Sequence, residues 1–436
     1  MSTRLLPQLV TGLAAAALLL TACSGDDNEP VGDSSSPDAD AGTDDADGVA
    51  DDPDPVTLQF FNFTAGADHV DKLDAIIADF EADNPHITIE TTNASFEDYF
   101  TQLQTQVAGN VAPDTFELNY ENFVSFASSG ALLDLETAAP SVIDPDVYFP
   151  RAYDAFTYDG VQYGLPESFS VVVLYYNKRL FDEAGLDYPD ETWTWDDQLA
   201  AGEALTEGDV WGIYQPVQFF EFYKVLVQNG GQFFNDDLTE ATFNSPEGVE
   251  AAEWLVNKVG SVMPTTADLG GQGDDQLFAS GRIGMWHTGI WMFNALGDMD
   301  DEWDIAVEPG NATRASHFFA NAAVASATTE HPEEAAAWLQ HLASSEVTVQ
   351  QRLEGEWELP AVFDDSLLAP YLEQSPPANR QAVFDALDEV VVPPVVADQQ
   401  QLQDIVTLAL ESAVIGSVSV EDALDDAAAQ VTSLLN

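Results

Sequence analysis

The sequence predicts an α/β fold in which helices connect parallel strands, and two changes of hydrophobic periodicity support it. Val56, Leu58 and Phe60 alternate with polar residues, as in a strand with one buried face. The apolar residues between Val70 and Phe80 recur instead at helical spacing, so they share one face of a helix. Asn84-Pro85 ends that helix, because the residue before a proline disfavours helical backbone.

The same order of elements then repeats along the chain. Residues 87–89 open a second strand, residues 100–107 mark a second helix, and residues 113–118 form a third strand. Strands that alternate with helices pair in parallel through right-handed crossovers. Ligands of such sheets bind beyond the carboxyl ends of the strands. Two loops are expected at that edge, residues 62–64 and 119–122.

A second set of elements begins near Gly164. The continuous apolar run at 171–176 suits a strand that is buried on both faces. The glycine-rich residues 269–273 lack the Lys-Ser/Thr pair of a phosphate-binding loop, so we interpret them as a surface turn. Further elements are a short strand at 281–286, helices at 243–259 and 332–342, and an amphipathic helical stretch at 400–435.

The charge balance excludes two classes of partner. The chain has 11 Lys and Arg residues against 77 Asp and Glu residues, a formal net charge of −66. Such a surface repels nucleic acid and anionic membrane faces. The carboxylates are scattered along the whole chain, which favours a solvated acidic surface suited to high salt over a cation-binding site. For the same reason, a pair of carboxylates is no evidence of catalysis here.

The N-terminus has the pattern of an exported protein. Arg4 is the only charged residue among the first 25, and the apolar run at 9–20 is shorter than a typical membrane-spanning helix. Residues 1–22 are therefore predicted to be a signal peptide. Leu20-Thr21-Ala22-Cys23 resembles the bacterial lipobox, which implies that Cys23 is lipidated and becomes the first mature residue. The alternative is a buried cysteine near a spanning helix.

Residues 23–55 are predicted to be a disordered acidic tether. They consist mostly of Ser, Gly, Asp, Ala and Pro, which leaves almost nothing to bury, and their like charges extend the chain. An acidic calcium-binding tract is the alternative, but the glycine and ligand spacing of a calcium loop is missing. Cys23 is the only cysteine, so an intrachain disulfide, a thiol enzyme and a Cys-ligated metal site are all excluded.

A series of short motifs runs through residues 56–436 in a fixed order. It comprises Asn84-Pro85-His86-Ile87, Ala112-Pro113-Asp114-Thr115, Ser129 to Leu135, Tyr163 to Pro166, Leu174 to Lys178, Leu180 to Leu186, Thr192 to Trp195, Phe278 to Met285 with Gly289-Ile290-Trp291, and His331 to Ala336. This series resembles the extracellular solute-binding proteins of carbohydrate-uptake ABC transporters, the group that includes maltose-binding protein.

The resemblance implies a type II periplasmic-binding-protein-like fold, with two α/β lobes joined by hinge strands and a ligand cleft between them. Residues 56–165 and 308–362 would form the first lobe, and residues 166–307 and 363–436 the second, with crossings near 164–166 and 306–307. A sugar or oligosaccharide would be captured by hinge closure and delivered to the membrane permease. A monomer on the extracytoplasmic face, held to the membrane by its lipid, is expected, with no catalysis, cofactor or metal.

A sugar presents apolar faces and a ring of hydroxyls, so its site should combine flat aromatic rings with planar polar groups. The resemblance places a stacking aromatic at Trp291, for which a core tryptophan is the alternative. The other candidates come from strand ends and from loops near the hinge. They are Tyr120, Glu121, Asn122, Asn62, Phe63, Glu167, Phe169, Ser170 and Trp357, with Gln215 and Phe219 of an aromatic-rich loop as weaker candidates.

Several alternatives remain open. Asn119 could simply cap a helix, and Trp357 could be a packed loop tryptophan. Phe318-Phe319-Ala320-Asn321 replaces the paired glycine that many family members carry before the last motif, so contacts there cannot be transferred. An exported glycoside hydrolase would need two carboxylates about 5–10 Å apart. A binding protein for a peptide or polyamine, or one that serves a sensory receptor, would share the fold.

Overall fold

The computed structural model describes residues 54–66, 69–148, 150–297, 299, 302–362 and 365–435. The predicted signal peptide, Cys23 and nearly all of the predicted tether lie outside these residues. Residues 52–436 form one compact unit. Its first six regular elements are β1 (Val56–Asn62), α1 (Val70–Asp83), β2 (Ile87–Asn93), α2 (Phe96–Ala108), β3 (Thr115–Asn119) and α3 (Tyr120–Ser128).

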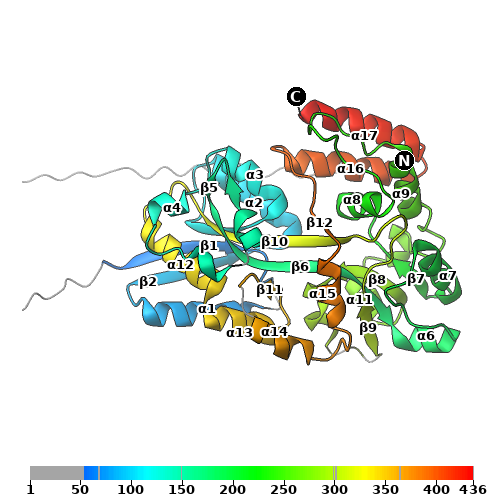
Figure 1. The fold of residues 1–436 in the computed structure, drawn as a ribbon, viewed down its shortest axis with the longest axis horizontal. Helices are drawn as coiled ribbons and strands as arrows, with labels where there is room; N and C mark the ends of the chain where they lie inside the picture. Colours follow the sequence, from blue (N-terminus) through cyan, green and yellow to red (C-terminus); the bar gives the residue numbers. More distant parts are fainter. Residues whose placement is uncertain are drawn as a thin grey trace, which may run out of the picture. The chain divides into compact units, whose positions relative to one another are not determined.

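The strands of this first part pair in parallel, as the alternation of strands and helices predicted. β1 pairs with β2 along its whole length and with β3 near its carboxyl end. Successive side chains of β1 point to opposite faces of the sheet. Phe60 packs with α1 and with α12 (Pro332–Ser344) on one face, and Phe61 packs with α2 and α3 on the other. Helices therefore cover both faces, as Figure 1 shows.

Short elements lead from α3 to the longest strand, β6 (Gly164–Asn177), whose fourteen residues are all buried. β6 pairs with β10 (Ser316–Ala325) from Gly164 to Val171, and from Val172 onward with β8 (Ile283–Gly289) and β9 (Trp303–Ala306). The short elements are α4 (Leu135–Ala138), η1 (Pro145–Val147), α5 (Pro150–Asp154), β4 (Thr157–Tyr158) and β5 (Val161–Gln162).

One continuous sheet results, with the strand order β2-β1-β3-β10-β6-β8-β7. Figure 1 shows β6 crossing between the elements around β1 and those around β8. The second group of elements comprises α6 (Lys178–Ala184), α7 (Trp195–Leu205), β7 (Trp211–Tyr214), α8 (Phe219–Gln228), α9 (Pro246–Val256), α10 (Thr266–Leu269), α11 (Asp274–Ala279), η2 (Ile290–Met292) and η3 (Asn294–Leu296).

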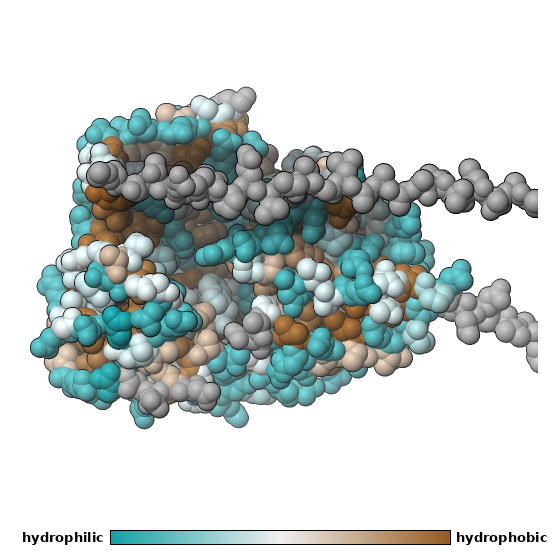
Figure 2. Space-filling model, turned by 180° about the vertical axis from the view of Figure 1, so that it is seen from behind, coloured by the Kyte–Doolittle hydropathy of each residue, from teal (hydrophilic) through white to brown (hydrophobic). Residues whose placement is uncertain are grey.

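The C-terminal part adds mainly helices. Side chains of α16 and α17 form one hydrophobic cluster with those of α8 and α9. Seen from behind, hydrophilic residues cover much of the visible face, and hydrophobic residues gather below these C-terminal helices (Figure 2). The remaining elements are α13 (Glu346–Glu354), β11 (Leu359–Pro360), α14 (Asp365–Leu372), α15 (Gln381–Leu387), β12 (Val390–Val391), α16 (Gln399–Val414) and α17 (Val420–Leu434).

Most elements predicted from the sequence are present, with shifted ends. The apolar run at 171–176 lies within β6, the segment 281–286 overlaps β8, and the helix expected at 243–259 is shorter, as α9. The stretch expected at 400–435 is divided into α16 and α17 by a turn at Gly416, whose φ of 73° suits glycine. The glycine-rich residues 270–273 are exposed, in agreement with the predicted surface turn.

Candidate ligand-binding site

The carboxyl ends of the strands bring buried polar side chains to one edge of the sheet. Asn62 ends β1 and Asn119 ends β3, and the register of the antiparallel pairs places Asn321 of β10 opposite both Asn119 and Ser168 of β6. All four side chains are buried. Burying a polar group costs free energy unless the group forms a hydrogen bond. The side chains at this edge of the sheet therefore need polar partners, from the protein or from a ligand.

Several predicted polar residues have side-chain atoms that no other described residue satisfies. Asn62 donates its amide to Asn93 at 2.6 Å, and Asn122 donates its amide to Asn119 at 2.8 Å. The amide oxygens of Asn62 and Asn122 and the hydroxyl of Ser170 are buried without a partner among the described residues. Each such group carries a free-energy cost of about 1–3 kcal/mol until something bonds to it.

Glu121 is the most pronounced example of a buried polar side chain without a hydrogen-bond partner among the described residues. Its side chain is fully buried at the start of α3, and neither carboxylate oxygen has a partner within the described part of the chain. Burial raises the pKa of Glu121 to about 7, because the charged form loses its hydration. The hydroxyl of Tyr223 on α8 is also buried and unpartnered, and burial followed by the Glu121 charge raises the pKa of Tyr223. Glu121 and Tyr223 thus come from two elements far apart in the sequence, and each has a buried side-chain oxygen without a partner among the described residues.

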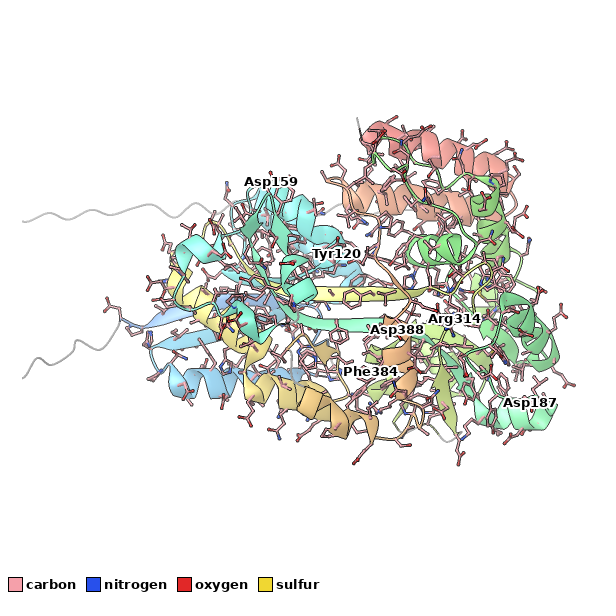
Figure 3. All side chains as sticks on the ribbon, viewed as in Figure 1. Tyr120, Asp159, Asp187, Arg314, Phe384 and Asp388 are labelled. Atoms are coloured by element: carbon pink, nitrogen blue, oxygen red, sulfur yellow. The ribbon has the colours of Figure 1, made fainter. Side chains whose placement is uncertain are left out.

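Tyr120, the neighbour of Glu121, is half-buried and keeps part of its ring accessible. Figure 3 shows it at the start of α3, near β10, and α3 contacts both β10 and α16. Its ring meets Phe156 edge to face, with 6.4 Å between the centroids. A partly exposed aromatic beside a buried carboxylate is the combination expected for a sugar-binding site.

Trp291 lies at the start of η2 and is half-buried. Its ring meets that of Phe319 on β10 at 5.8 Å between the centroids. Phe319 in turn contacts Phe220 of α8 at 5.9 Å and stacks on His317 at 5.1 Å. Trp291 therefore packs against strand β10 through Phe319. The sequence interpretation had not included Phe319 among the site residues.

The aromatic contacts continue to the other half of the sheet. Phe220 lies 6.5 Å from Phe96 at the start of α2, and Phe96 lies 5.5 Å from Phe63 in the loop after β1. Phe96 is 47% exposed, whereas Phe63 and Phe220 are half-buried. The predicted residues Trp291 and Phe63 thus stand at the two ends of one aromatic band, which runs through Phe319, Phe220 and Phe96.

Comparison with known proteins places the chain in one family. Residues 66–349, more than half of the chain, match the family described as bacterial extracellular solute-binding proteins. The chain belongs to this family. The family and the α/β fold indicated by the sequence motifs are therefore confirmed.

Three relatives illustrate what this solute-binding protein is similar to. An ABC substrate-binding protein of Listeria monocytogenes, solved in complex with cycloalternan, is 44% identical with a TM-score of 0.84 and covers 87% of this chain and 99% of its own. A cyclic α-maltosyl-1,6-maltose-binding protein of Arthrobacter globiformis is 26% identical with a TM-score of 0.70 and covers 87% and 99%. An uncharacterized lipoprotein of Streptomyces antibioticus is 24% identical over 326 residues and covers 70% of each chain.

Not every predicted residue of this solute-binding protein lies open to a ligand. Trp357 is only 2% exposed, donates its indole N–H to the carbonyl of Thr64 at 3.0 Å, and stacks on His69 at 5.0 Å. The guanidinium of Arg352 lies 4.2 Å from the centre of the same ring. These are the contacts of the packed loop tryptophan that the sequence left as an alternative.

Glu167, Phe169 and Ser170 lie on β6 where it pairs with β10. Phe169 is buried and stacks on Phe318 at 5.9 Å, and Ser170 is opposite Phe319. Glu167 forms a fully buried ion pair with Arg352. Burial, and then the charge of nearby Glu117, raise the pKa of Glu167 well above its ordinary value. Glu167 is therefore part of a buried, ion-paired cluster.

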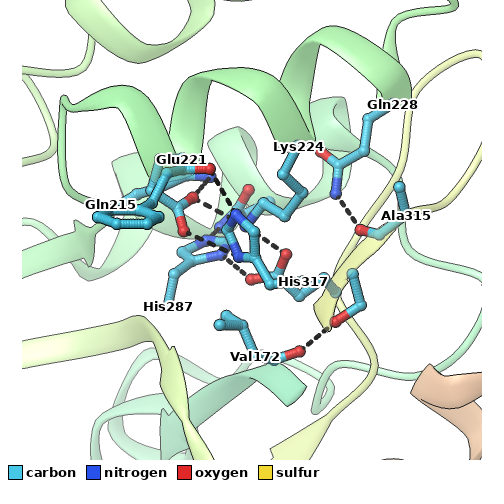
Figure 4. Close-up of polar contacts among 12 residues, drawn as sticks. Val172, Gln215, Glu221, Lys224, Gln228, His287, Ala315 and His317 are labelled. Carbon is cyan, nitrogen blue, oxygen red and sulfur yellow. Dashed lines mark hydrogen bonds and ion pairs between the residues drawn. The ribbon is translucent and has the colours of Figure 1, made fainter. Parts of the chain in front are cut away.

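Gln215 belongs to a second buried network, which Figure 4 shows. Its amide donates to Glu221 at 2.8 Å, and its oxygen accepts from Lys258. Lys224 forms ion pairs with Glu221, at 2.8 Å, and with Glu308. Burial alone would raise the pKa of Glu221, but the charge of Lys224 holds it below its ordinary value. The neighbouring candidate Phe219 is buried in the cluster that α8 forms with the C-terminal helices.

The second network also contains two histidines. His287 bonds to Glu308 at 2.6 Å, and His317, on β10, bonds to the carbonyl of Phe220. Burial lowers the pKa of His317 to about 4. His317 thereby connects this network to Phe220 and Phe319 of the aromatic band. The sequence offered one usable signal for the network, the charged pair Glu221 and Lys224 inside the otherwise apolar run of α8.

Proposed function

We propose that this protein captures a carbohydrate between its two halves and delivers it to an ABC-type membrane permease. The observation that carries the proposal is the edge of the sheet around Glu121. Unpartnered, buried polar atoms of Asn62, Glu121, Asn122 and Ser170 gather there, beside an aromatic band that ends at Trp291. Sugar hydroxyls would satisfy the polar atoms, and the apolar faces of the sugar would stack on the rings.

Similarity to a protein solved in complex with cycloalternan and to a cyclic α-maltosyl-1,6-maltose-binding protein supports a carbohydrate ligand. An oligosaccharide is also in keeping with the several rings of the aromatic band, which connects Trp291 to Phe63. Binding without catalysis is proposed, because the family is one of binding proteins.

Hinge closure is the proposed mechanism. The lobe limits implied by the sequence placed the crossings near 164–166 and 306–307. We now propose that the chain crosses within β6, where its pairing changes from β10 to β8 between Val171 and Val172, and at the start of β10. A ligand that contacts both lobes stabilises the closed state only by the contacts that the open state lacks.

Lipid anchoring at Cys23 is the second part of the proposal. The lipobox-like residues 20–23 and the following acidic tether would hold the binding domain away from the extracytoplasmic face of the membrane. Similarity to an uncharacterized lipoprotein of Streptomyces antibioticus supports this. Within the segments that the structure describes, no helix has the length and apolar character needed for a membrane span.

Thermal unfolding of residues 52–436 in high salt, against a panel of mono- and oligosaccharides, tests the proposal. A ligand at a hundred times its Kd adds about 2.7 kcal/mol to the stability, which in a chain of this size raises Tm by roughly 3 °C. We expect such a shift with one sugar class, with the sugar recovered unchanged. Shifts with peptides or polyamines alone would disprove the carbohydrate ligand, and a cleaved sugar would favour the glycoside hydrolase.

A further inference from the structure

The unpartnered polar atoms at the strand ends share one chemical property. The amide oxygens of Asn62 and Asn122 can only accept hydrogen bonds, and so can both carboxylate oxygens of Glu121 when its side chain is ionised. The other two unpartnered groups there, the hydroxyls of Ser170 and Tyr223, can both donate and accept. The site therefore has an excess of acceptors, and a complementary ligand must bring donors.

The charge at this site is also uncompensated. Among the residues described, no Lys, Arg or His forms an ion pair with Glu121. The nearest buried cation along α8, Lys224, is already held by Glu221 and Glu308. Arg352 is held by Glu167. A negative charge that a ligand brought to Glu121 would therefore find no positive partner.

We propose that Glu121 makes the site select against acidic sugars, so that sugars carrying a carboxylate or phosphate are rejected while neutral and amino sugars are accepted. This inference rests on the proposed function and names the ligand class of that same site. Glu121 acts as a specificity-determining residue rather than only as one polar contact among several.

Two physical effects act in the same direction. A carboxylate of a uronic acid offers acceptors only, so beside Asn62, Asn122 and Glu121 it would leave buried acceptors unpaired. It would also place a second negative charge in a site that water leaves, where like charges repel strongly. A hydroxyl donates to these acceptors, and an ammonium brings three donors and a compensating charge.

The acidic surface contributes a similar but separable effect. The formal net charge of −66 repels any anionic ligand at low ionic strength. At about 1 M salt the screening length falls to about 3 Å, which suppresses the field of exposed carboxylates but leaves a buried contact nearly unchanged. Discrimination that persists in high salt therefore comes from the site and not from the surface.

Isothermal titration of the full chain in detergent at pH 8.5, where Glu121 is ionised, at low salt and at 2 M NaCl, tests the inference. The probes are matched sets of a neutral trisaccharide, its C6-oxidised uronate and its 6-amino-6-deoxy derivative, built on maltotriose, mannotriose and cellotriose. For the series that binds, we expect the uronate to bind about tenfold or more weakly than the neutral sugar at both salt concentrations. The amino derivative should bind at least as well as the neutral sugar.

Three variants test whether Glu121 is responsible for the discrimination between neutral sugars and uronates. E121Q removes the charge, and we expect the neutral-to-uronate ratio to fall to about threefold or less. E121D keeps the charge, so the discrimination should persist even if all affinities weaken. E203Q removes one carboxylate from the exposed face of α7 and should leave the ratio in 2 M NaCl unchanged.

The possible failures can be told apart. Equal binding of the neutral and uronate forms by the wild-type chain overturns the inference and leaves the proposed function intact. An unchanged ratio in E121Q shows that another group sets the specificity and also overturns it. A series in which no sugar binds at all contradicts the proposed function, and the inference falls with it.

Discussion

The ring of Trp291 lies against the backbone of Gly289, so close that a Cβ on Gly289 would stand 1.8 Å from the ring carbon Cζ3. The φ of Gly289 is −90°, which any residue can adopt, so the glycine is required here by space and not by backbone conformation. Gly289 therefore determines where the first candidate aromatic of the site can lie.

Gly289→Ala is expected to displace the Trp291 indole and to weaken sugar binding by about tenfold, while the fold is kept. Since the added methyl group acts through the ring, the same substitution in a Trp291→Ala background should have almost no further effect on Kd. Titration of the two single variants and the double variant measures this coupling. Additive losses would show that Gly289 and Trp291 act independently.

Glu121 should make the stability of the ligand-free protein depend on pH. Its pKa in the folded state is raised to about 7 from an ordinary value of 4.5, so the folded protein holds this proton more tightly than the unfolded chain does. The resulting stability is complete below pH 4.5 and is lost as the pH rises through 7. At pH 8 the loss amounts to about 3 kcal/mol at most.

Thermal unfolding of wild type and E121Q between pH 4 and 8 measures this effect. The Tm of E121Q minus that of wild type should increase between about pH 4.5 and 7 and then level off, because Gln carries no charge to desolvate. Other titrating groups contribute equally to both proteins and cancel in the difference. A difference in Tm that does not change with pH would show that Glu121 is hydrated in the ligand-free protein.

Arg352→Met is expected to destabilise the fold by about 3–5 kcal/mol, because it leaves the Glu167 carboxylate buried without its guanidinium partner. The double variant with Glu167→Gln should recover part of this loss, since the uncompensated charge is then gone. Urea unfolding compares them with Arg179→Met, which removes an exposed ion pair with Glu183 and should cost less than about 1 kcal/mol. Equal losses of unfolding free energy in the two arginine variants would show that the ion pair of Arg352 with Glu167 is not buried and stabilising as described.

Local sequence patterns were sufficient for the first strands and for the place of the polar residues. The alternation from Val56 to Phe60 defines β1 and its two faces, and the order of strands and helices puts Asn62 and Glu121 at the same edge of the sheet. Both follow from periodicity and from the rule for parallel strands. Neither requires knowledge of which distant segments meet.

Contacts between segments that are far apart in the chain could not be predicted from the sequence. Trp357 is enclosed by His69 and Arg352, and nothing in the residues around Trp357 indicates these partners. Phe319 and Phe220 meet only because of how β10 and α8 pack, although the Phe318-Phe319 pair had marked the segment as unusual. The side-chain environment of a loop aromatic depends on tertiary packing, which a local pattern does not determine.

Replacing Cys23 by Ser should release the protein from the membrane. If the lipid on Cys23 is the anchor, the wild-type chain will partition into the detergent phase and incorporate radiolabelled palmitate, while Cys23→Ser will be found in the aqueous phase without label. Ser24→Ala changes the neighbouring residue without removing the thiol and serves as the control. The purified Cys23→Ser protein should bind sugar with unchanged affinity, because the site lies entirely within residues 52–436, which form a compact unit of their own. A Cys23→Ser protein that stays with the membrane would show that another segment holds it there.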